Sequence, residues 1–579
     1  MRLLWGSFVT FAVCGRESNL SSRPFRLLFQ EEGWNFPNQP PMLCLDSGGE
    51  LRFTYNFYTY SGDHAATLIP SFDKEVDTPS TFIAVKEWLQ NCHCIFKLSE
   101  PRPFQPTRVL DIGNEGQDHV TLIETRGIII TSYACLSYCW GGSQPLVNST
   151  QRKPSSDEWA ISIHELPKTF EDFIKTLRRL DFRYAWIDSL CIIQDDLNDK
   201  EREIKQMPNI YKNSDLTLCA STAHSCNEGF LQPRPDYSEH QLQLIMPNNK
   251  VGTLHFNFSW DEIDEIDEPL DTRAWALQER LLSPRLLEYG QRTSRWSCSC
   301  TKGYGGHQHF PTSARSRNDS KTAFCHNYMF NYLSPQGIRD IAQRKDQLYD
   351  CWERIVRQYT RRKLTFQDDR LAAIAGVASE LQERTGVPYL AGLWDHETLP
   401  FLLLWRNESL PHQLDSRPTI TCAPSWSWAA VNASVTFSAL YTGKRVDKSF
   451  SVLSTNVSGG FGMSASGSVT VEGPVRRGSE WYKDWDFTKY SEKFSYRGYG
   501  YKLDIYPDFH GEILQFQDDI TLVKSLDLSF IVVVHHPLWI AGLILSKKDE
   551  TNHTRVGLFE IYGEESFIAD WSVERLTIV

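Results

Sequence analysis

The stretch Tyr133-Ala-Cys-Leu-Ser-Tyr-Cys-Trp-Gly-Gly142 decides how the chain is expected to fold. Most of its side chains are apolar or aromatic and they partly alternate with polar ones, which is typical of a mostly buried strand. The two glycines at its end predict a tight turn, because glycine adopts backbone conformations that other residues avoid. We therefore expect a strand that runs to Trp140 and turns at Gly141 and Gly142.

A helix and two more strands are predicted downstream. Pro167 stands at a first helical position, and an apolar stripe at helical spacing follows it. The run 184–193 is rich in β-branched and aromatic residues, which predicts a strand buried on both faces. A second helix over 199–211 leads to a third strand at 216–221, and Pro208 is expected to kink or split this helix.

Strands that alternate with helices predict an α/β fold, with a mainly parallel sheet flanked by helices. Ligands of such folds bind outside the carboxyl ends of the strands. Two groups of residues follow predicted strand ends and are therefore the first candidates for a site. They are Trp140, Gly141 and Gly142 after the first strand, and Gln194, Asp195 and Asp196 after the second.

The chain of 579 residues is longer than one hydrophobic core usually supports, so several regions are expected. Amphipathic sequence between 340 and 383 predicts helices, whereas short apolar runs such as 528–534, separated by turn residues, predict strands. Trp426 and Trp428 share one strand face and are expected to fill a core. The regions are a lead-in region at 1–129, the α/β domain at 130–300, a mainly helical region at 301–400 and a β-rich region at 401–579.

The composition argues against a protein that binds duplex nucleic acid. The formal net charge is −12, from 60 Lys and Arg residues against 72 Asp and Glu residues. Binding to a duplex requires basic side chains clustered on one face, and the sequence contains no such cluster. We therefore expect no nucleic-acid partner.

The cysteines indicate a reducing compartment. Fourteen cysteines in 579 residues are too few and too scattered for a disulfide framework. The pairs Cys92/Cys94 and Cys298/Cys300 are spaced more tightly than a usual zinc knuckle, so we expect buried thiols and no metal site. This cysteine usage predicts a cytoplasmic protein.

The remaining signals concern membranes and export. No stretch of about 18 apolar residues is found, so no transmembrane helix is expected. Residues 1–20 contain a short apolar run after Arg2 that loosely resembles a signal peptide. A buried strand or an artefact of the gene model explains that run equally well, and a secreted hydrolase is the function that a signal peptide would imply.

Three blocks of this sequence together resemble the heterokaryon-incompatibility (HET) domain of fungi. The first two blocks are rich in aromatic residues, the third contains Trp275, and the order and spacing of the three agree with that family. Two downstream motifs, Asp369-Arg-Leu-x-Ala-Ile-x-Gly376 and Pro424-Ser-Trp-Ser-Trp428, are similar to the tail that commonly follows the domain, and Arg108 to Ile112 looks like its lead-in. The blocks are Tyr133 to Gly141, Leu166 to Asp195 and Arg273 to Arg285.

The resemblance implies a role in vegetative incompatibility, in which fused but genetically different hyphae trigger death of the mixed compartment. The chain is thus predicted to be an effector of programmed cell death after nonself recognition, a form of innate immunity. Its implied partners are proteins, either an incompatibility factor or further copies of itself. The family is also distantly similar to Toll/interleukin-receptor domains, some of which cleave NAD with a glutamate near the edge of the sheet.

Two mechanisms remain open, an NAD-cleaving enzyme and a non-enzymatic interaction module. Cleavage requires a carboxylate that stabilises an oxocarbenium-like centre, and Asp188, Asp195 and Glu279 are the candidates. Gln194 occupies the position of the Toll-like glutamate and cannot act as a carboxylate. Asp188 is equally well explained as a structural residue that caps a turn or pairs with Arg273. The candidate ligand-binding residues are Tyr138, Trp140, Gly141, Gly142, Gln194 and Arg273, with NAD as a candidate substrate and no cofactor.

Overall fold

The chain forms two compact units in the computed structural model. The first contains residues 1–271 and 283–331, and the second contains residues 272–282 and 332–579. The chain therefore leaves the first unit, contributes residues 272–282 to the second unit, and returns. The structure describes residues 9–11, 25–29, 43–46, 52–60, 62–67, 71–72, 74–92, 104–142, 158–235, 240–245, 250–259, 268–291, 294–298, 346–409, 413–415, 417, 422–437, 446–459, 461–462, 464–481, 485–486, 495–498, 502–509, 528–563 and 570–579.

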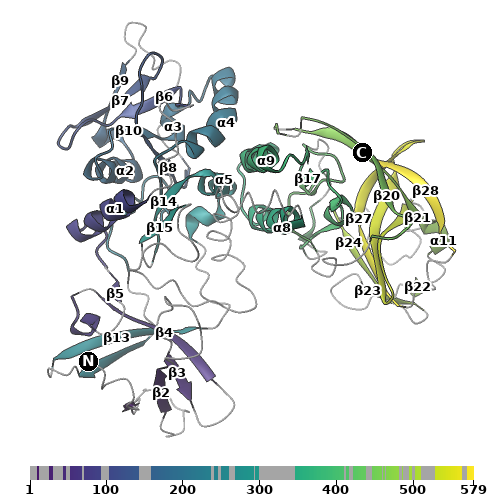
Figure 1. Cartoon of the computed structure of the whole chain (residues 1–579), viewed down its shortest axis with the longest axis horizontal. Coiled ribbons are helices and arrows are strands. Elements are labelled where there is room, and N and C mark those ends of the chain that lie inside the picture. Colours follow the sequence, from purple (N-terminus) through teal and green to yellow (C-terminus); the bar gives the residue numbers. More distant parts are fainter. Residues whose placement is uncertain are drawn as a thin grey trace. The chain divides into compact units, whose positions relative to one another are not determined.

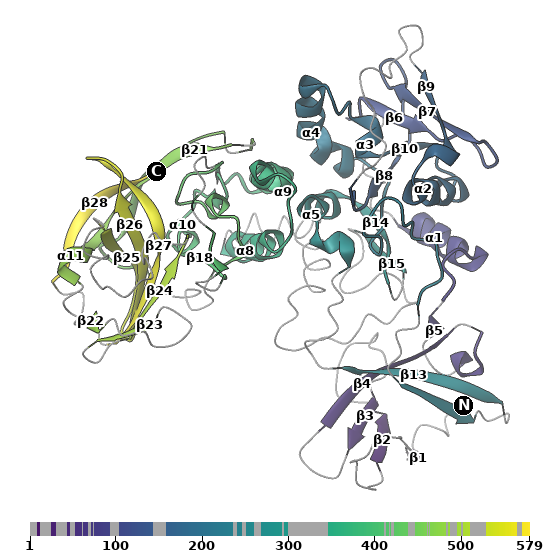
Figure 2. The same ribbon diagram turned by 180° about the vertical axis from the view of Figure 1, so that it is seen from behind.

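One of the two sheets of the first unit is antiparallel along its main path, with the strand order β1-β2-β3-β4-β13-β12. A short strand, β5, pairs with β4 in parallel. Figure 2 shows this sheet beside its label N. Its strands are β1 (Val9–Phe11), β2 (Phe25–Phe29), β3 (Leu43–Asp46), β4 (Arg52–Tyr60), β5 (Ser71–Phe72), β12 (His240–Ile245) and β13 (Val251–Ser259).

The other sheet of the first unit contains the first two sequence blocks and has the order β15-β14-β11-β8-β10-β6-β7-β9. Its strands are β6 (Arg108–Asp111), β7 (His119–Glu124), β8 (Ala134–Ser137), β9 (Glu158–Ser162), β10 (Tyr184–Trp186), β11 (Leu216–Cys219), β14 (Arg285–Tyr289) and β15 (Ser294–Cys298). The helices that accompany it are α1 (Pro79–Asn91), α2 (Lys168–Arg179), α3 (Asp188–Cys191) and α4 (Leu197–Lys212).

The sequence predicted a mainly parallel sheet, but this sheet is mixed. Its four central strands, β14, β11, β8 and β10, pair in parallel, as expected for strands joined through helices. The strands outside them pair antiparallel. Sequence analysis detected only the strands next to amphipathic helices, so the antiparallel strands on both sides were missed.

Helices α2 and α4 cover opposite sides of the central strands (Figure 1). On one side, the Tyr138 ring packs edge-on against Phe170 of α2, with ring centroids 5.1 Å apart. On the other, the Tyr133 hydroxyl donates to the carbonyl of Ile210 in α4 at 2.6 Å. All four residues of β8 are consequently buried.

The predicted strand 184–193 ends early. Strand β10 stops at Trp186, and residues from Asp188 onward form the helical turn α3. The N–H groups of Leu190 and Cys191 both bond to the carbonyl of Ile187, which closes the turn. A short apolar run is compatible with a buried strand or a buried turn, so hydrophobicity alone gave the wrong assignment.

Pro208 does not split the second helix, because α4 continues through it from Leu197 to Lys212. Met207, Ile210 and Tyr211 lie on the buried face of this helix. Packing of that face thus outweighs the one backbone hydrogen bond that proline cannot make.

The second unit has helices followed by a β-rich region, as predicted. Its helices are α5 (Ala274–Leu282), α8 (Asp346–Thr360), α9 (Ala372–Thr385), α10 (Leu399–Leu402) and α11 (Gly478–Trp481). Two small strand pairs are β16 (Tyr389–Leu390) with β17 (Leu393–Trp394) and β18 (Trp405–Asn407) with β19 (Val435–Phe437). Within the described residues, no helix is both long and apolar enough to cross a bilayer.

The large sheet of the second unit closes on itself. It has nine strands in the order β20-β21-β25-β26-β27-β24-β23-β22, and β28 pairs with both β21 and β27. Closure removes unpaired edges between β21 and β27, which would otherwise be open to other chains. The strands are β20 (Ser451–Ser458), β21 (Ser466–Arg477), β22 (Trp485–Asp486), β23 (Ser495–Gly498), β24 (Lys502–Pro507), β25 (Leu528–His536), β26 (Trp539–Lys547), β27 (Asn552–Tyr562) and β28 (Ser572–Ile578).

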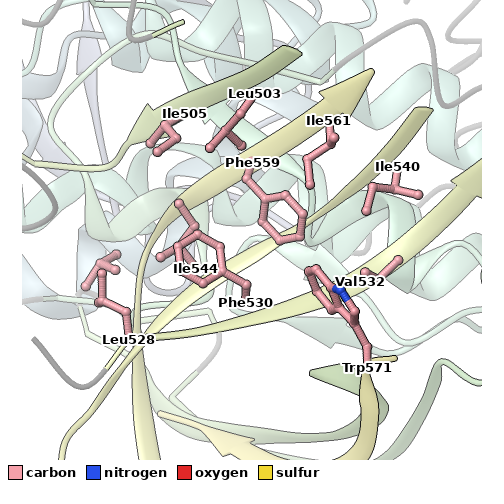
Figure 3. Packing of buried hydrophobic residues seen from close by; sticks show 11 residues of the cluster. Leu503, Ile505, Leu528, Phe530, Val532, Ile540, Ile544, Phe559, Ile561 and Trp571 are labelled. Atoms are coloured by element: carbon pink, nitrogen blue, oxygen red, sulfur yellow. The ribbon is translucent and has the colours of Figure 1, made fainter. Parts of the chain in front are cut away.

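Apolar side chains from several of these strands meet in one core. Figure 3 shows Phe530 of β25 and Phe559 of β27 at its centre, with Trp571 beside them. The two phenyl rings pack edge to face at 5.5 Å. Trp426 and Trp428 are fully buried elsewhere in this unit, which confirms that they fill a core. The predicted strand is wrong, because Trp426 lies in a turn and Trp428 begins a 3-10 helix that ends at Ala430.

Candidate functional site

A buried carboxylate, Asp188, lies directly after the carboxyl end of β10. The residue is 5% exposed, and three donors reach its oxygens. The Tyr138 hydroxyl donates to Oδ1 at 2.9 Å, the Trp140 indole Nε1–H donates to Oδ2 at 2.9 Å, and the Ser189 backbone N–H donates to Oδ1 at 2.7 Å. A buried carboxylate is stable only when such donors replace its lost hydration. The structure therefore brings Tyr138, Trp140 and Asp188 together.

The Tyr138 hydroxyl also links this carboxylate to a serine. Its oxygen lies 3.1 Å from Oγ of Ser189. The Tyr138 hydroxyl donates toward both Asp188 Oδ1 and Ser189 Oγ, so its single proton is shared between these two acceptors. Sequence analysis did not identify Ser189, since a serine next to an aspartate carries no distinct signal.

The glycine turn after β8 is held close to the loop that follows β11. Gly141 and Gly142 are exposed and have φ values of 67° and 110°, which favour glycine. A Cβ atom on Gly141 would lie 2.1 Å from Cβ of Ser225. The Cys226 N–H donates to the Trp140 carbonyl at 3.4 Å, so the two loops are hydrogen-bonded as well. The absence of a side chain at Gly141 is thus a packing requirement.

A buried ion cluster supports the other side of the α3 turn. Arg108 on β6 is 5% exposed and forms ion pairs with Asp199, at 2.5 Å, and with Glu203, at 3.9 Å, both on α4. Its Nε donates to the Cys191 carbonyl at 2.7 Å, and the Ile193 N–H donates to Asp199 at 2.9 Å. The cluster joins β6, α3 and α4. Sequence analysis placed Arg108 only within the family lead-in and missed its partners.

The predicted site residues that follow β10, at positions 194–196, differ in whether they face the protein or the solvent. The Gln194 side-chain amide donates to the carbonyls of Asp188 and Ile192 at 3.3 and 3.1 Å, so it faces the turn. Asp196 caps α4 by accepting from two N–H groups of its first turn at 2.9 and 3.1 Å. Asp195, between them, is exposed. Asp195 is therefore the carboxylate of this segment that faces solvent.

Glu279 and Arg273 are not in the compact unit that contains Asp188. Both belong to the segment 272–282 of the second unit. Glu279 is 1% exposed on α5, and the Arg273 carbonyl accepts from the Arg362 guanidinium at 3.3 Å. The structure thus divides the predicted site residues between two units.

A second buried aspartate, Asp172, was missed by sequence analysis. It is 1% exposed on α2, and its Oδ2 accepts from the N–H groups of Phe230 and Leu231 at 2.9 and 3.2 Å. These bonds fix the loop after β11 to α2. A signal was available, because Thr169, Asp172 and Thr176 place polar groups at helical spacing on the buried face.

The chemistry open to this arrangement follows from these contacts. Burial raises the pKa of the Cys191 thiol to about 12, which favours the neutral thiol over the thiolate at neutral pH. Within the described residues, no cluster of three or more His, Cys, Asp and Glu side chains is placed to hold a metal ion. Around the strand ends, Trp140 is half-buried, while Gly141, Gly142 and Asp195 are exposed.

The fold and the site define an α/β unit whose strand-end loops are organised around a buried aspartate. Residues 133–279 match the family described as "Heterokaryon incompatibility protein (HET)". This segment of the chain is therefore similar to the HET domain. A similar relative is "Heterokaryon incompatibility protein 6, OR allele" of Neurospora crassa, with 26% identity over 161 residues, which is 27% of this chain and 21% of that relative. No solved structure matches the chain.

Proposed function

We propose that this protein is an effector of heterokaryon incompatibility that triggers programmed cell death after nonself recognition in a filamentous fungus. The observation that carries the proposal is the HET match over residues 133–279, which includes every residue of the Asp188 site. The name of the Neurospora crassa relative refers to the same process. Death of a shared cytoplasm requires an effector within it, so we propose a cytoplasmic location.

We propose further that the HET domain acts as an interaction module. Each carboxylate oxygen of Asp188 already accepts at least one hydrogen bond from Tyr138, Trp140 or Ser189. Such a carboxylate positions its donors and is poorly suited to approach a substrate. The half-buried Trp140 ring and the adjoining glycine turn then form the surface offered to a protein partner or to a second copy of the chain.

An NAD-cleaving activity of the Toll/interleukin-receptor type is the second candidate. It is favoured by the exposure of Asp195 close to the turn that carries Asp188, where α/β folds bind ligands. In this version Asp195 supplies the negative charge that stabilises the developing oxocarbenium ion, and Trp140 stacks on a base. Asp188 keeps its structural role in both versions.

Two matched aspartate variants separate the versions. The wild type, Asp188→Asn and Asp195→Asn are expressed from an inducible promoter in a filamentous fungus, and viability and total NAD are followed over time. Asparagine at 188 replaces one accepting oxygen by an NH2 group, which then faces one of the donors Tyr138, Trp140 and Ser189. Two opposed donors cannot form a hydrogen bond, so the turn at Trp140 is disturbed. The module predicts that Asp188→Asn abolishes death, that Asp195→Asn does not, and that NAD is unchanged before death.

The opposite pattern identifies an enzyme. Loss of NAD before loss of viability, with both abolished by Asp195→Asn in protein of normal abundance, would replace the module by NAD cleavage. Full viability with abundant wild-type protein would contradict the proposed role in cell death itself.

A further inference from the structure

The segment 272–282, which contains the last residues of the HET match, is part of the second unit. Helix α5 packs there against α8 and α9. Its start is fixed by two backbone hydrogen bonds, from Ala274 N–H to the Lys363 carbonyl at 3.0 Å and from Lys363 N–H to the Thr272 carbonyl at 2.6 Å. These bonds hold the segment to the chain that follows α8.

Two side chains of the segment reach a motif almost one hundred residues further along the chain. Gln278 is 2% exposed, and its Oε1 accepts from the Gly376 N–H of α9 at 2.7 Å. The Trp275 indole donates to Asp369 at 3.4 Å. Asp369 and Gly376 are the first and last residues of the downstream motif 369–376. This motif therefore binds the third sequence block, 273–285.

Both ends of the same segment are anchored in the first unit. Before it, the Leu270 N–H donates to the Ser221 carbonyl at 3.3 Å. After it, the Ser283 and Thr217 hydroxyls are hydrogen-bonded at 2.6 Å, and β14 continues in parallel beside β11. The flanks of α5 therefore belong to the first unit, and its packing partners α8 and α9 belong to the second.

We infer that α5 is a docking helix by which the second unit holds the HET domain, through Gln278 on Gly376 and Trp275 on Asp369. The matched segment 133–279 is accordingly not a self-contained domain, because its last element depends on α9. The docking itself does not depend on the proposed cell-death function, whereas any effect of the docking on the onset of death does.

The docking is tested by cleaving the folded full-length protein between the two units and measuring whether the two pieces stay associated. A recognition sequence for a site-specific protease is inserted between Asn331 and Tyr332, and the purified protein is cleaved and diluted through a sizing column. Gln278→Met keeps the length of the side chain and removes the acceptor for Gly376 N–H. Gln382→Met is the matched control, because Gln382 on α9 also accepts a backbone N–H, from Tyr389 at 2.7 Å.

Wild type and Gln382→Met are expected to co-elute as one particle, and the apparent dissociation constant of the two pieces is expected to rise at least about tenfold in Gln278→Met. Equal dissociation constants for Gln278→Met and wild type would overturn the docking. Hydrogen exchange of the uncut chain gives a second reading: α9 should exchange faster in Gln278→Met while β25 to β27 stay protected, and unchanged exchange in α9 would also overturn it.

The cellular reading separates this inference from the proposed function. Wild type and Gln278→Met are induced in the fungal host, and the onset of death is compared. A changed onset in Gln278→Met but not in Gln382→Met supports control through α5, and equal onset in all three rejects it. If the host stays viable when the wild-type protein is induced, the proposed function is contradicted. The docking result from the cleaved chain is unaffected by that outcome.

Discussion

Asp188 shows how one residue organises a set of loops. Its two oxygens collect a tyrosine from the end of β8, an indole from the glycine turn and the N–H of its own α3 turn. Charge-assisted hydrogen bonds of this kind are stronger than neutral ones, and the buried surroundings reduce competition from water. An aspartate at this position is therefore explained by folding, independently of any reaction.

Gly141 offers a direct test at the residue scale. Gly141→Ala should destabilise the first unit by about 2 to 5 kcal/mol, because its Cβ would overlap Ser225 and alanine is strained at positive φ. Gly142→Ala is the control, since its φ is also positive but no atom of the described residues lies within 4 Å of the added Cβ. It should cost only about 1 to 2 kcal/mol.

Hydrogen exchange of the peptide 133–142 measures the difference between these two variants. Faster exchange in Gly141→Ala than in Gly142→Ala is expected. Equal exchange would show that the loop after β11 moves away without cost, and that the close contact with Ser225 is not a requirement of the fold.

At the scale of the element, helix α8 carries a carboxyl group that opposes folding at neutral pH. Glu353 has a side chain that is 13% exposed and lies 3.7 Å from Arg357. Burial raises its pKa from 4.5 to about 7, an effect that the arginine reduces without cancelling. The folded form keeps its proton where the unfolded form has lost it, so the second unit loses stability as the pH rises from about 4.5 to about 7.

Glu353→Gln should remove this dependence. The variant is expected to be more stable than wild type at pH 8, by at most about 3 kcal/mol, and equally stable at pH 4. Denaturant unfolding of the second unit at the two pH values measures the effect. Glu383→Gln, an exposed site on α9, is the control and should change stability by less than about 0.5 kcal/mol at either pH. A gain that is the same at pH 4 and pH 8 would contradict the explanation by burial.

The elements also differ in how well the sequence predicted them. Helix α2 has a strong amphipathic pattern and was located within one residue at its start, where Pro167 is the N-cap and not the first helical residue. The α3 turn was predicted as a strand, because four buried residues have no period that distinguishes the two. Short elements take their conformation from partners, in this case Asp188 and the Arg108 cluster.

At the scale of whole folded units, Arg555 connects the closed sheet of the second unit to the elements before it. The residue is fully buried and pairs with Asp508 at 3.1 Å. Its guanidinium also donates to the carbonyls of Leu403 and Trp405, each at 2.5 Å, and lies 3.5 Å above the Trp405 ring. One side chain of β27 thereby fixes α10, β18 and the end of β24.

Arg555→Met should destabilise the second unit by about 3 to 5 kcal/mol, because it leaves the Asp508 carboxylate buried without its cation. Arg575→Met is the control, since Arg575 pairs with Glu472 at the surface, and it should cost at most about 1 kcal/mol. Thermal unfolding of each variant, monitored by hydrogen exchange of peptides from β27, measures both changes in stability. A cost for Arg555→Met as small as that of the control would show that the pair does not contribute to this connection.

The sequence by itself determined the parts of this protein that depend on neighbouring residues. The three sequence blocks, the strand, helix and strand around Tyr133 to Trp186, the buried tryptophans and the order of helices before strands all follow from local periodicity and composition. Only the tertiary structure decided which residues meet across long separations. The antiparallel outer strands, the pairing of Arg108 with Asp199 and the docking of Gln278 on Gly376 depend on contacts between distant segments, and local patterns carry no record of them.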